Sequence, residues 1–146
     1  MSESRDHGRI RLEQTISSRM DEAEMLCLKI REVLEPDGLP QLCFRVELLA
    51  REILANALNH GNGNDPEKSV VLQLRISRTW IRLRVTDEGP GFAWRNALKK
   101  TPGTNETSGR GMRIYVLYAA RTQFNRRGNQ ITIWIDRKSE QGMEIK

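Results

Sequence analysis

The sequence Arg51-Glu52-Ile53-Leu54-Ala55-Asn56-Ala57-Leu58-Asn59-His60-Gly61 decides how the rest of the chain is interpreted. It has the pattern of the second half of a long helix. At roughly 100° per residue, Glu52, Asn56 and His60 share one face, with Asn59 beside them. The other face carries six apolar residues, which are Val46, Ala50, Ile53, Leu54, Ala57 and Leu58. A helix with this many apolar residues is normally packed against the rest of the protein. Its polar stripe is interpreted either as a ligand or metal site or as a surface that faces solvent.

Length and composition predict a single soluble domain. The chain has 146 residues, of which 38% are hydrophobic and 29% charged, and we expect one domain over residues 1–146. No apolar run is long enough to cross a bilayer, and the segment from Met1 to Asp6 lacks the apolar core of a signal peptide. Cys27 and Cys43 are isolated in apolar helical patterns, which predicts buried thiols and a cytoplasmic protein without a membrane partner.

The charge pattern does not favour a nucleic-acid-binding protein. The formal net charge is +5 and the pI is about 9.6, but the arginines are scattered along the chain and not gathered in one basic helix. Neither an RNA-binding aromatic motif nor a zinc-finger spacing is present. We therefore expect no direct nucleic-acid contact, and a basic surface that faces an acidic protein or a nucleotide.

Periodicity and turn residues predict an alternation of helices and strands. Ser17 and Ser18 are interpreted as the N-cap of the first helix, whose first turn is acidic. The expected helices are one from this cap to about Leu34, one from Pro40 to about His60, and one from Met112 to about Ala120. The expected strands are Arg9 to Glu13, Val70 to Ile76, Trp80 to Thr86, Thr122 to Asn125, and Gln130 to Asp136, and residues 93–108 are expected to form a mobile loop.

One carboxylate stands out in the third of these strands. Ile81, Leu83 and Val85 share one face, and the same period of two places Asp87 on that apolar face at the strand's end. A carboxylate directed toward a core is costly unless a hydrogen-bonding partner is present. The turn Glu88-Gly89-Pro90-Gly91-Phe92 follows at once.

The opposite face of the predicted sheet is basic and aromatic. Trp80, Arg82 and Arg84 lie there by the same alternation, together with Trp134 from the last strand. Two interpretations of this face remain open: it is a surface that binds another protein, or the tryptophans cover the sheet within the monomer.

Three motifs occur in a specific order. They are Glu52-x3-Asn56-x3-His60 on a helix, Asp87-x-Gly89-x-Gly91 after a strand, and Gly109-x-Gly111 before a helix, with a loop between the two glycine motifs. Together they resemble the N box and the two glycine boxes of the GHKL superfamily, which includes gyrase, sensor histidine kinases and MutL-type ATPases. The resemblance covers residues 48–135. It implies an α+β two-layer sandwich, in which about three helices cover one face of a mixed, mostly antiparallel sheet (the Bergerat fold).

Within this superfamily, the chain is most similar to the stand-alone anti-sigma-factor serine kinases of bacterial partner-switching systems. The features that match are the strand and helix before the N box and its Glu-x3-Asn-Ala-x2-His form. The resemblance implies a cytoplasmic serine/threonine-protein kinase. Its implied partners are a STAS-type antagonist, which it phosphorylates, and a sigma factor, which it sequesters; family members are often homodimers. The alternative is a regulator of the same fold that binds nucleotide and protein without phosphotransfer.

The resemblance implies ATP and Mg²⁺ as cofactors and assigns a role to each motif. Asp87 would accept a hydrogen bond from the adenine amino group, and Gly89 and Gly91 would leave room for base and ribose. Asn56 would ligate Mg²⁺. The second glycine box would bind phosphate through backbone amides, under a lid formed by residues 93–108. The remaining nucleotide-binding residues implied by the two boxes are Phe92, Gly109, Arg110, Gly111 and Met112.

Glu52 lies one turn before Asn56 and is implied as the carboxylate that activates the serine hydroxyl of a substrate. His60 would either support the phosphate site or cap the helix end. The chain departs from the family pattern at Gly128-Asn129, where Gly-Thr is common, and at the bulky Arg110 between the second-box glycines. Arg110 and Arg113 would either neutralise phosphate charge or remain solvated.

Overall fold

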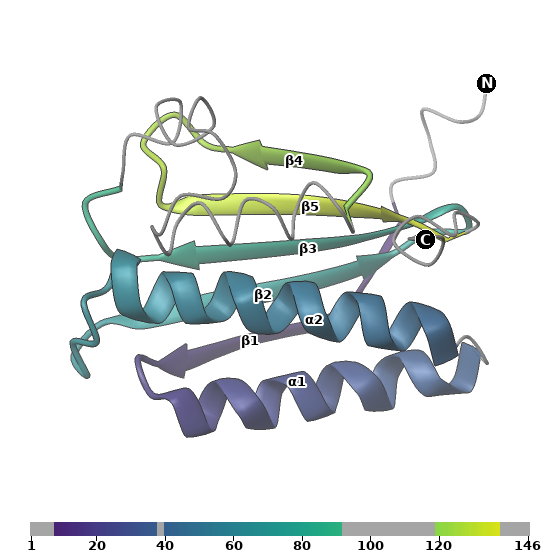
Figure 1. Ribbon diagram of the computed structural model, residues 1–146, viewed down its shortest axis with the longest axis horizontal. Helices are drawn as coiled ribbons and strands as arrows, with labels where there is room; N and C mark the ends of the chain where they lie inside the picture. Colours follow the sequence, from purple (N-terminus) through teal and green to yellow (C-terminus); the bar gives the residue numbers. More distant parts are fainter. Residues whose placement is uncertain (1–7, 38–39, 92–118, 138–146) are drawn as a thin grey trace, which may run out of the picture.

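The computed structural model describes residues 8–37, 40–91 and 119–137. In these residues an antiparallel sheet is covered on one face by two long helices, α1 and α2, which lie side by side (Figure 1). The helices are α1 (Met20–Leu34) and α2 (Pro40–Asn56), with a 3₁₀ turn at Glu35–Asp37 and a π-helical turn at Ala57–Gly61. The strands are β1 (Arg9–Ser17), β2 (Ser69–Ile76), β3 (Trp80–Asp87), β4 (Arg121–Phe124) and β5 (Gln130–Asp136).

The sheet has the order β1-β2-β3-β5-β4, and each pair of neighbouring strands is antiparallel. In β2 and β3, every second residue is buried, as expected when helices cover one face of a sheet. In β1 the pairing register slips between Ile10 and Leu12, so that Arg11 has no partner opposite it on β2. The predicted α+β sandwich with a mostly antiparallel sheet is confirmed.

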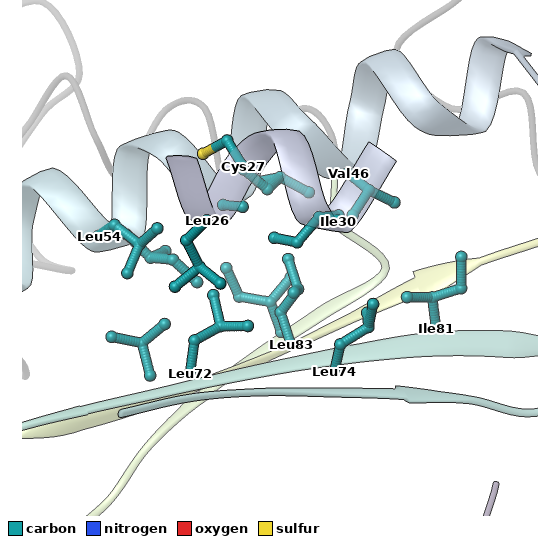
Figure 2. Packing of buried hydrophobic residues seen from close by; sticks show 14 of the residues in the cluster. Leu26, Cys27, Ile30, Val46, Leu54, Leu72, Leu74, Ile81 and Leu83 are labelled. Atoms are coloured by element: carbon teal, nitrogen blue, oxygen red, sulfur yellow. The ribbon is translucent and has the colours of Figure 1, made fainter. Parts of the chain in front are cut away.

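The core lies between the helices and the sheet. Leu26, Cys27 and Ile30 of α1 and Val46 and Leu54 of α2 face Leu72, Leu74, Ile81 and Leu83 of the sheet (Figure 2). All six residues predicted for the apolar face of the second helix are buried. Each fully buried leucine or isoleucine contributes roughly 1.5–3 kcal/mol, so the polar stripe of α2 is held in place by its apolar face.

Two ion pairs fix the antiparallel arrangement of α1 and α2. Arg31 Nη2 lies 2.8 Å from Glu47 Oε1, and Arg51 Nη2 lies 2.9 Å from Glu24 Oε1. Cys27 and Cys43 are buried thiols that form no disulfide, as predicted. Neither α1 nor α2 combines the length and the hydropathy that a membrane-spanning helix requires.

The start of α1 differs from the prediction. Ser17 belongs to β1, where it pairs with Ser69, and the helix is preceded by Arg19, which makes no side-chain capping bond. Glu22 in the first turn instead reaches back and accepts hydrogen bonds from the backbone N–H of Ser17 at 3.0 Å and from its hydroxyl at 2.6 Å. The serine cap is therefore wrong because β1 extends beyond the predicted end at Glu13. Met20, the first residue of α1, is 42% exposed.

The third predicted helix falls mostly outside the described residues. Ala119 and Ala120 are described and are not helical. The backbone N–H of Ala120 donates to the carbonyl of Trp134 at 2.8 Å, next to the start of β4. The predicted helix end at Ala120 is thus wrong, because neither residue is helical and Ala120 is hydrogen-bonded to β5.

Candidate nucleotide site

A cavity of about 230 Å³ lies where the end of α2 meets the ends of β3 and β5. Its apolar lining comes from the core faces of these elements: Ile53, Ala57, Val85, Phe124 and Ile131. Five polar side chains also line it, and they are Asn56, His60, Asp87, Asn129 and Gln130. An apolar cavity with a few convergent polar groups is the usual form of a small-molecule site.

Asp87 is the most unusual of these groups. It ends β3 on the core face and is 9% exposed, as its sequence position predicted. Burial raises the pKa of its carboxyl above the ordinary value, against the opposing effects of the Gly89 hydrogen bond and the nearby Arg127 and Lys68. Among the described residues, the backbone N–H of Gly89 is the one hydrogen-bond donor to this carboxylate, at 2.7 Å from Oδ1. Oδ2 is therefore available to a donor on a ligand.

The glycines around Asp87 are required by close contacts within the chain. A Cβ atom on Gly61 would overlap the Asp87 carboxylate, and one on Gly89 would overlap the carbonyl of Gly61. Gly91 has a φ of +88°, and a Cβ there would overlap the carbonyl of Arg127. The positions that side chains would take at Gly89 and Gly91 are thus occupied by backbone carbonyls, while Gly91 also lines the cavity. These contacts hold the turn after β3 against the end of α2.

The polar stripe of the second helix divides into two parts. Asn56, half-buried, and His60, exposed, both line the cavity. Glu52 is half-buried one turn earlier and does not line it. After Asn56 the helix widens into the π-helical turn Ala57–Gly61, a departure that often accompanies functional sites. The helix end is closed by the backbone N–H of Asn62 on the carbonyl of Ala57, at 2.8 Å, and not by the His60 side chain.

The turn between β4 and β5 holds Asp87 through Asn129, noted in the sequence only as a departure from the family pattern, and through Asn125, which the sequence analysis did not identify. Asn125 Oδ1 accepts from the backbone N–H of Gly128 at 2.7 Å, and Asn125 Nδ2 donates to Asn129 Oδ1 at 2.7 Å. Asn129 Nδ2 in turn donates to the Asp87 carbonyl at 2.9 Å. Asn129, which stands where the family pattern commonly has threonine, therefore holds the backbone of Asp87 through this hydrogen bond. The signal in the sequence is an asparagine at each end of a glycine turn.

Asn62 forms a second buried connection. It is 3% exposed, and its Nδ2 donates to Ser18 Oγ and to the Ser69 carbonyl, each at 3.0 Å. Its Oδ1 accepts from the backbone N–H of Glu88 at 2.8 Å. One side chain thus links the turn after Asp87 to the start of β2 and to the corner between β1 and α1.

The structure therefore brings together Asn56, His60, Asp87 and Gly91 around one cavity. The remaining predicted residues lie outside the described part of the chain: Phe92, Gly109, Arg110, Gly111 and Met112, together with Arg113 and the predicted lid at residues 93–108.

Residues 16–135 match the model of a protein family described as the histidine kinase-like ATPase domain. The chain therefore belongs to the family of histidine kinase-like ATPase domains. No match was found among curated proteins. A solved structure similar to this one is the histidine kinase domain from the blue-light activated histidine kinase of Erythrobacter litoralis EL346, with 21% identity and a TM-score of 0.46. The similarity covers 88% of this chain, which spans only 64% of that domain.

Membership of this family implies an ATP-binding domain, and the cavity fits that ligand. Its apolar walls suit a flat base, and the carboxylate of Asp87 provides an acceptor for an exocyclic amino group such as that of adenine. Asn56 provides an amide oxygen, a ligand type that Mg²⁺ accepts. The described residues thus offer the kinds of group that the base of ATP and its metal ion require.

Proposed function

We propose that the protein is an ATP- and Mg²⁺-dependent serine/threonine-protein kinase that also acts as an anti-sigma factor in a partner switch. The observation that carries the proposal is the position of Glu52. It lies one helical turn from Asn56, on the helix whose end lines the Asp87 cavity. Glu52 does not line the base cavity, as expected of a group that acts at the γ-phosphate end of the nucleotide.

Each residue has a defined task in this proposal. Asp87 binds the adenine amino group and fixes the orientation of the base. Asn56 holds Mg²⁺, which neutralises phosphate charge when bound. Glu52 accepts the proton of a serine hydroxyl as its oxygen attacks the γ-phosphorus of ATP, and ADP leaves. The substrate is a serine on a STAS-type antagonist protein. The sequestered partner is a sigma factor, bound by the protein as a homodimer.

Phosphate transfer from labelled ATP to a STAS-type antagonist tests the proposal. We expect phosphoserine on the antagonist with the wild type. Glu52→Gln, which keeps the shape of the side chain, should transfer at least about a hundredfold more slowly, in line with general-base catalysis. It should still bind nucleotide, because Glu52 does not line the base cavity. Glu32→Gln on the exposed surface of α1 is the matched control and should retain full activity.

The absence of Glu52 from the lining of the base cavity also supports a second function, a nucleotide-gated protein-binding regulator without phosphotransfer. This alternative predicts that Asp87→Asn abolishes both nucleotide binding and the nucleotide dependence of partner binding. It also predicts that wild type and Glu52→Gln behave alike. Equal and negligible phosphoserine with both proteins, in the presence of bound ATP, would refute the kinase and leave this alternative.

A further inference from the structure

The face of the sheet opposite α1 and α2 carries an unusual row of side chains, which we call the arginine face. Four strands contribute directly opposite positions, in the order Arg75 on β2, Arg82 on β3, Trp134 on β5 and Arg121 on β4. Ile10 on β1 extends the row opposite Arg75 and is 47% exposed. Arg84 lies in the next row on the same face. Like charges on directly opposed strand positions destabilise a sheet, so this arrangement requires an explanation.

Three arginines of this face are held by neutral groups. Arg82 Nη2 donates to Gln73 Oε1 at 2.6 Å, and Arg84 Nε donates to Thr132 Oγ1 at 3.0 Å. The guanidinium of Arg121 lies over the Trp134 ring, 4.6 Å from its centroid. Within the described residues, Arg82, Arg84 and Arg121 have no carboxylate partner. Arg82 Nε is buried there without a hydrogen bond.

Three exposed arginines on the helical side of the molecule do have carboxylate partners. Arg19, Arg31 and Arg51 each form an ion pair with a neighbouring carboxylate. The three arginines named above differ from these because no carboxylate of the described residues forms an ion pair with them; Glu13, in the same row as Arg84, instead accepts a hydrogen bond from Gln73 Nε2 at 3.3 Å. Burial, and secondarily the charges of Arg84 and Arg75, lower the pKa of Arg82, which reflects the same crowding. An external group that brings negative charge would relieve it.

We propose that the arginine face binds an acidic segment of another protein, whose carboxylates pair with Arg82, Arg84 and Arg121. Guanidinium groups form bidentate bonds with carboxylates, and arginine and tryptophan are the residues most enriched at the energetic centres of protein interfaces. Trp134 and the exposed Ile10 would supply apolar contact between the charged positions. The partner is thus an acidic segment interspersed with apolar side chains.

Two other occupants fit the face less well. A second copy of this chain, docked face to face, would set arginines against arginines. A nucleic acid would supply negative charge, but its bases bind by stacking on open aromatic rings. Arg121 covers the Trp134 ring, and the Trp80 ring lies against Gly8, where an added Cβ would stand 2.9 Å from Trp80 Cη2.

The arginine face is independent of the proposed phosphotransfer. The nucleotide cavity is lined from the core side of the sheet by Val85 and Ile131, whose side chains alternate with those of Arg84 and Thr132. Charge changes on the arginine face should therefore leave nucleotide binding intact. Nucleotide affinity serves as the check that each variant is folded.

Peptide binding to the full chain tests the proposal. The probe is a synthetic peptide of repeated glutamate-glutamate-leucine, and the reporter is the fluorescence of Trp80 and Trp134 in a Trp94→Phe background. The paired variant Arg82→Glu/Arg84→Glu should bind the peptide at least about tenfold more weakly at physiological salt. Arg121→Glu, an exposed position, tests the same face with less risk to folding and should weaken binding about threefold or more. The matched control is Arg11→Glu/Arg78→Glu, two exposed arginines away from the arginine row, and should change the affinity by less than about twofold.

Four results would overturn the proposal. The first is absence of peptide binding by the wild type at physiological salt. The second is equal weakening by the control pair, which would indicate attraction to net charge alone. The third is tighter binding of single-stranded oligothymidylate with as many phosphates as the peptide has carboxylates, which would assign the face to nucleic acid. The fourth is binding of a glutamine-glutamine-leucine peptide, since the proposal requires carboxylates.

Discussion

Replacement of Asp87 by asparagine should move stability and nucleotide affinity in opposite directions. The side chain is 9% exposed, and its Oδ1 accepts a 2.7 Å hydrogen bond from Gly89. Asparagine keeps this acceptor, since its amide oxygen can take the place of Oδ1. The substitution removes the buried charge and puts a donor in place of the second oxygen, which accepts no hydrogen bond from the described residues. The two consequences are separable by experiment.

The effect on stability follows from the direction of the pKa shift. Burial raises the pKa of Asp87 in the folded protein above 3.8, so the folded state binds this proton more tightly than the unfolded state does. Ionisation of Asp87 therefore destabilises the fold as pH rises through the folded pKa. The Asp87→Asn variant avoids this loss and should gain about 1 kcal/mol at neutral pH, or roughly 2–5 °C in Tm. The advantage should vanish as pH falls below the ordinary value of 3.8, where Asp87 is protonated in both states.

The effect on binding has the opposite sign. An adenine amino group directed at position 87 would meet the amide N–H₂ of the introduced asparagine, and two donors would face each other in a buried site. We expect a loss of about 2–4 kcal/mol, or roughly 30- to 1000-fold in Kd.

Thermal unfolding measured across acidic to neutral pH, with calorimetric titration of ATP, reports both quantities. Glu67→Gln, an exposed carboxylate in the loop before β2, is the matched control. Unchanged ATP affinity in Asp87→Asn would refute the assignment of the base site. If Asp87→Asn is less stable than the wild type at neutral pH, the inference that ionised Asp87 destabilises the fold is refuted.

Three further predictions concern the surroundings of this carboxylate and the core. Asn129→Ala removes the 2.9 Å bond to the Asp87 carbonyl and should lower the free energy of unfolding by about 1–2 kcal/mol. It should also weaken ATP binding several-fold, whereas Arg126→Ala in the same turn should leave calorimetric titrations unchanged. Gly61→Ala places a Cβ against the Asp87 carboxylate and should abolish ATP binding. Gly63→Ala is the control, because φ at Gly63 is +61° and no atom lies within 4 Å of the added Cβ. It should lower the free energy of unfolding by about 1 kcal/mol and leave the affinity for ATP unchanged. Burial raises the pKa of the Cys27 thiol to about 11, so mass spectrometry after iodoacetamide treatment at mildly alkaline pH should find Cys27 unmodified in the native protein and alkylated in urea.

The amino-acid pattern predicts the helices, the strands and the inward position of Asp87, because periodicity reports which face of an element is buried. Periodicity correctly predicted the burial of the six apolar residues of the second helix and the alternating burial along β3. The pattern also places Asn56 and Asp87 in one site through the order of the motifs, and the structure brings both to the same cavity.

Contacts between distant segments could not be predicted in this way. Asn62 bonds to Ser18 across 44 positions, and Asn129 bonds to Asp87 across 42. No local signal specifies either partner. Ser17 has the local chemistry of a helix cap, but its pairing with Ser69 places it in the sheet, and tertiary structure overrides the local preference. Gly61 ends a helix, a common place for glycine, and its contact with the Asp87 carboxylate appears only in three dimensions.

The register slip in β1 bears on how the sheet resists the addition of strands from other chains. In the described part of the sheet, β1 is an edge strand, and such edges offer unpaired backbone groups to other chains. The bulge at Arg11 interrupts the regular spacing of these groups, and Arg9, Arg11 and Glu13 place charges along the strand. A neighbouring molecule that attempted to extend the sheet would have to match an irregular ladder and bury these charges. The register slip and these charges thus oppose edge-to-edge aggregation at β1.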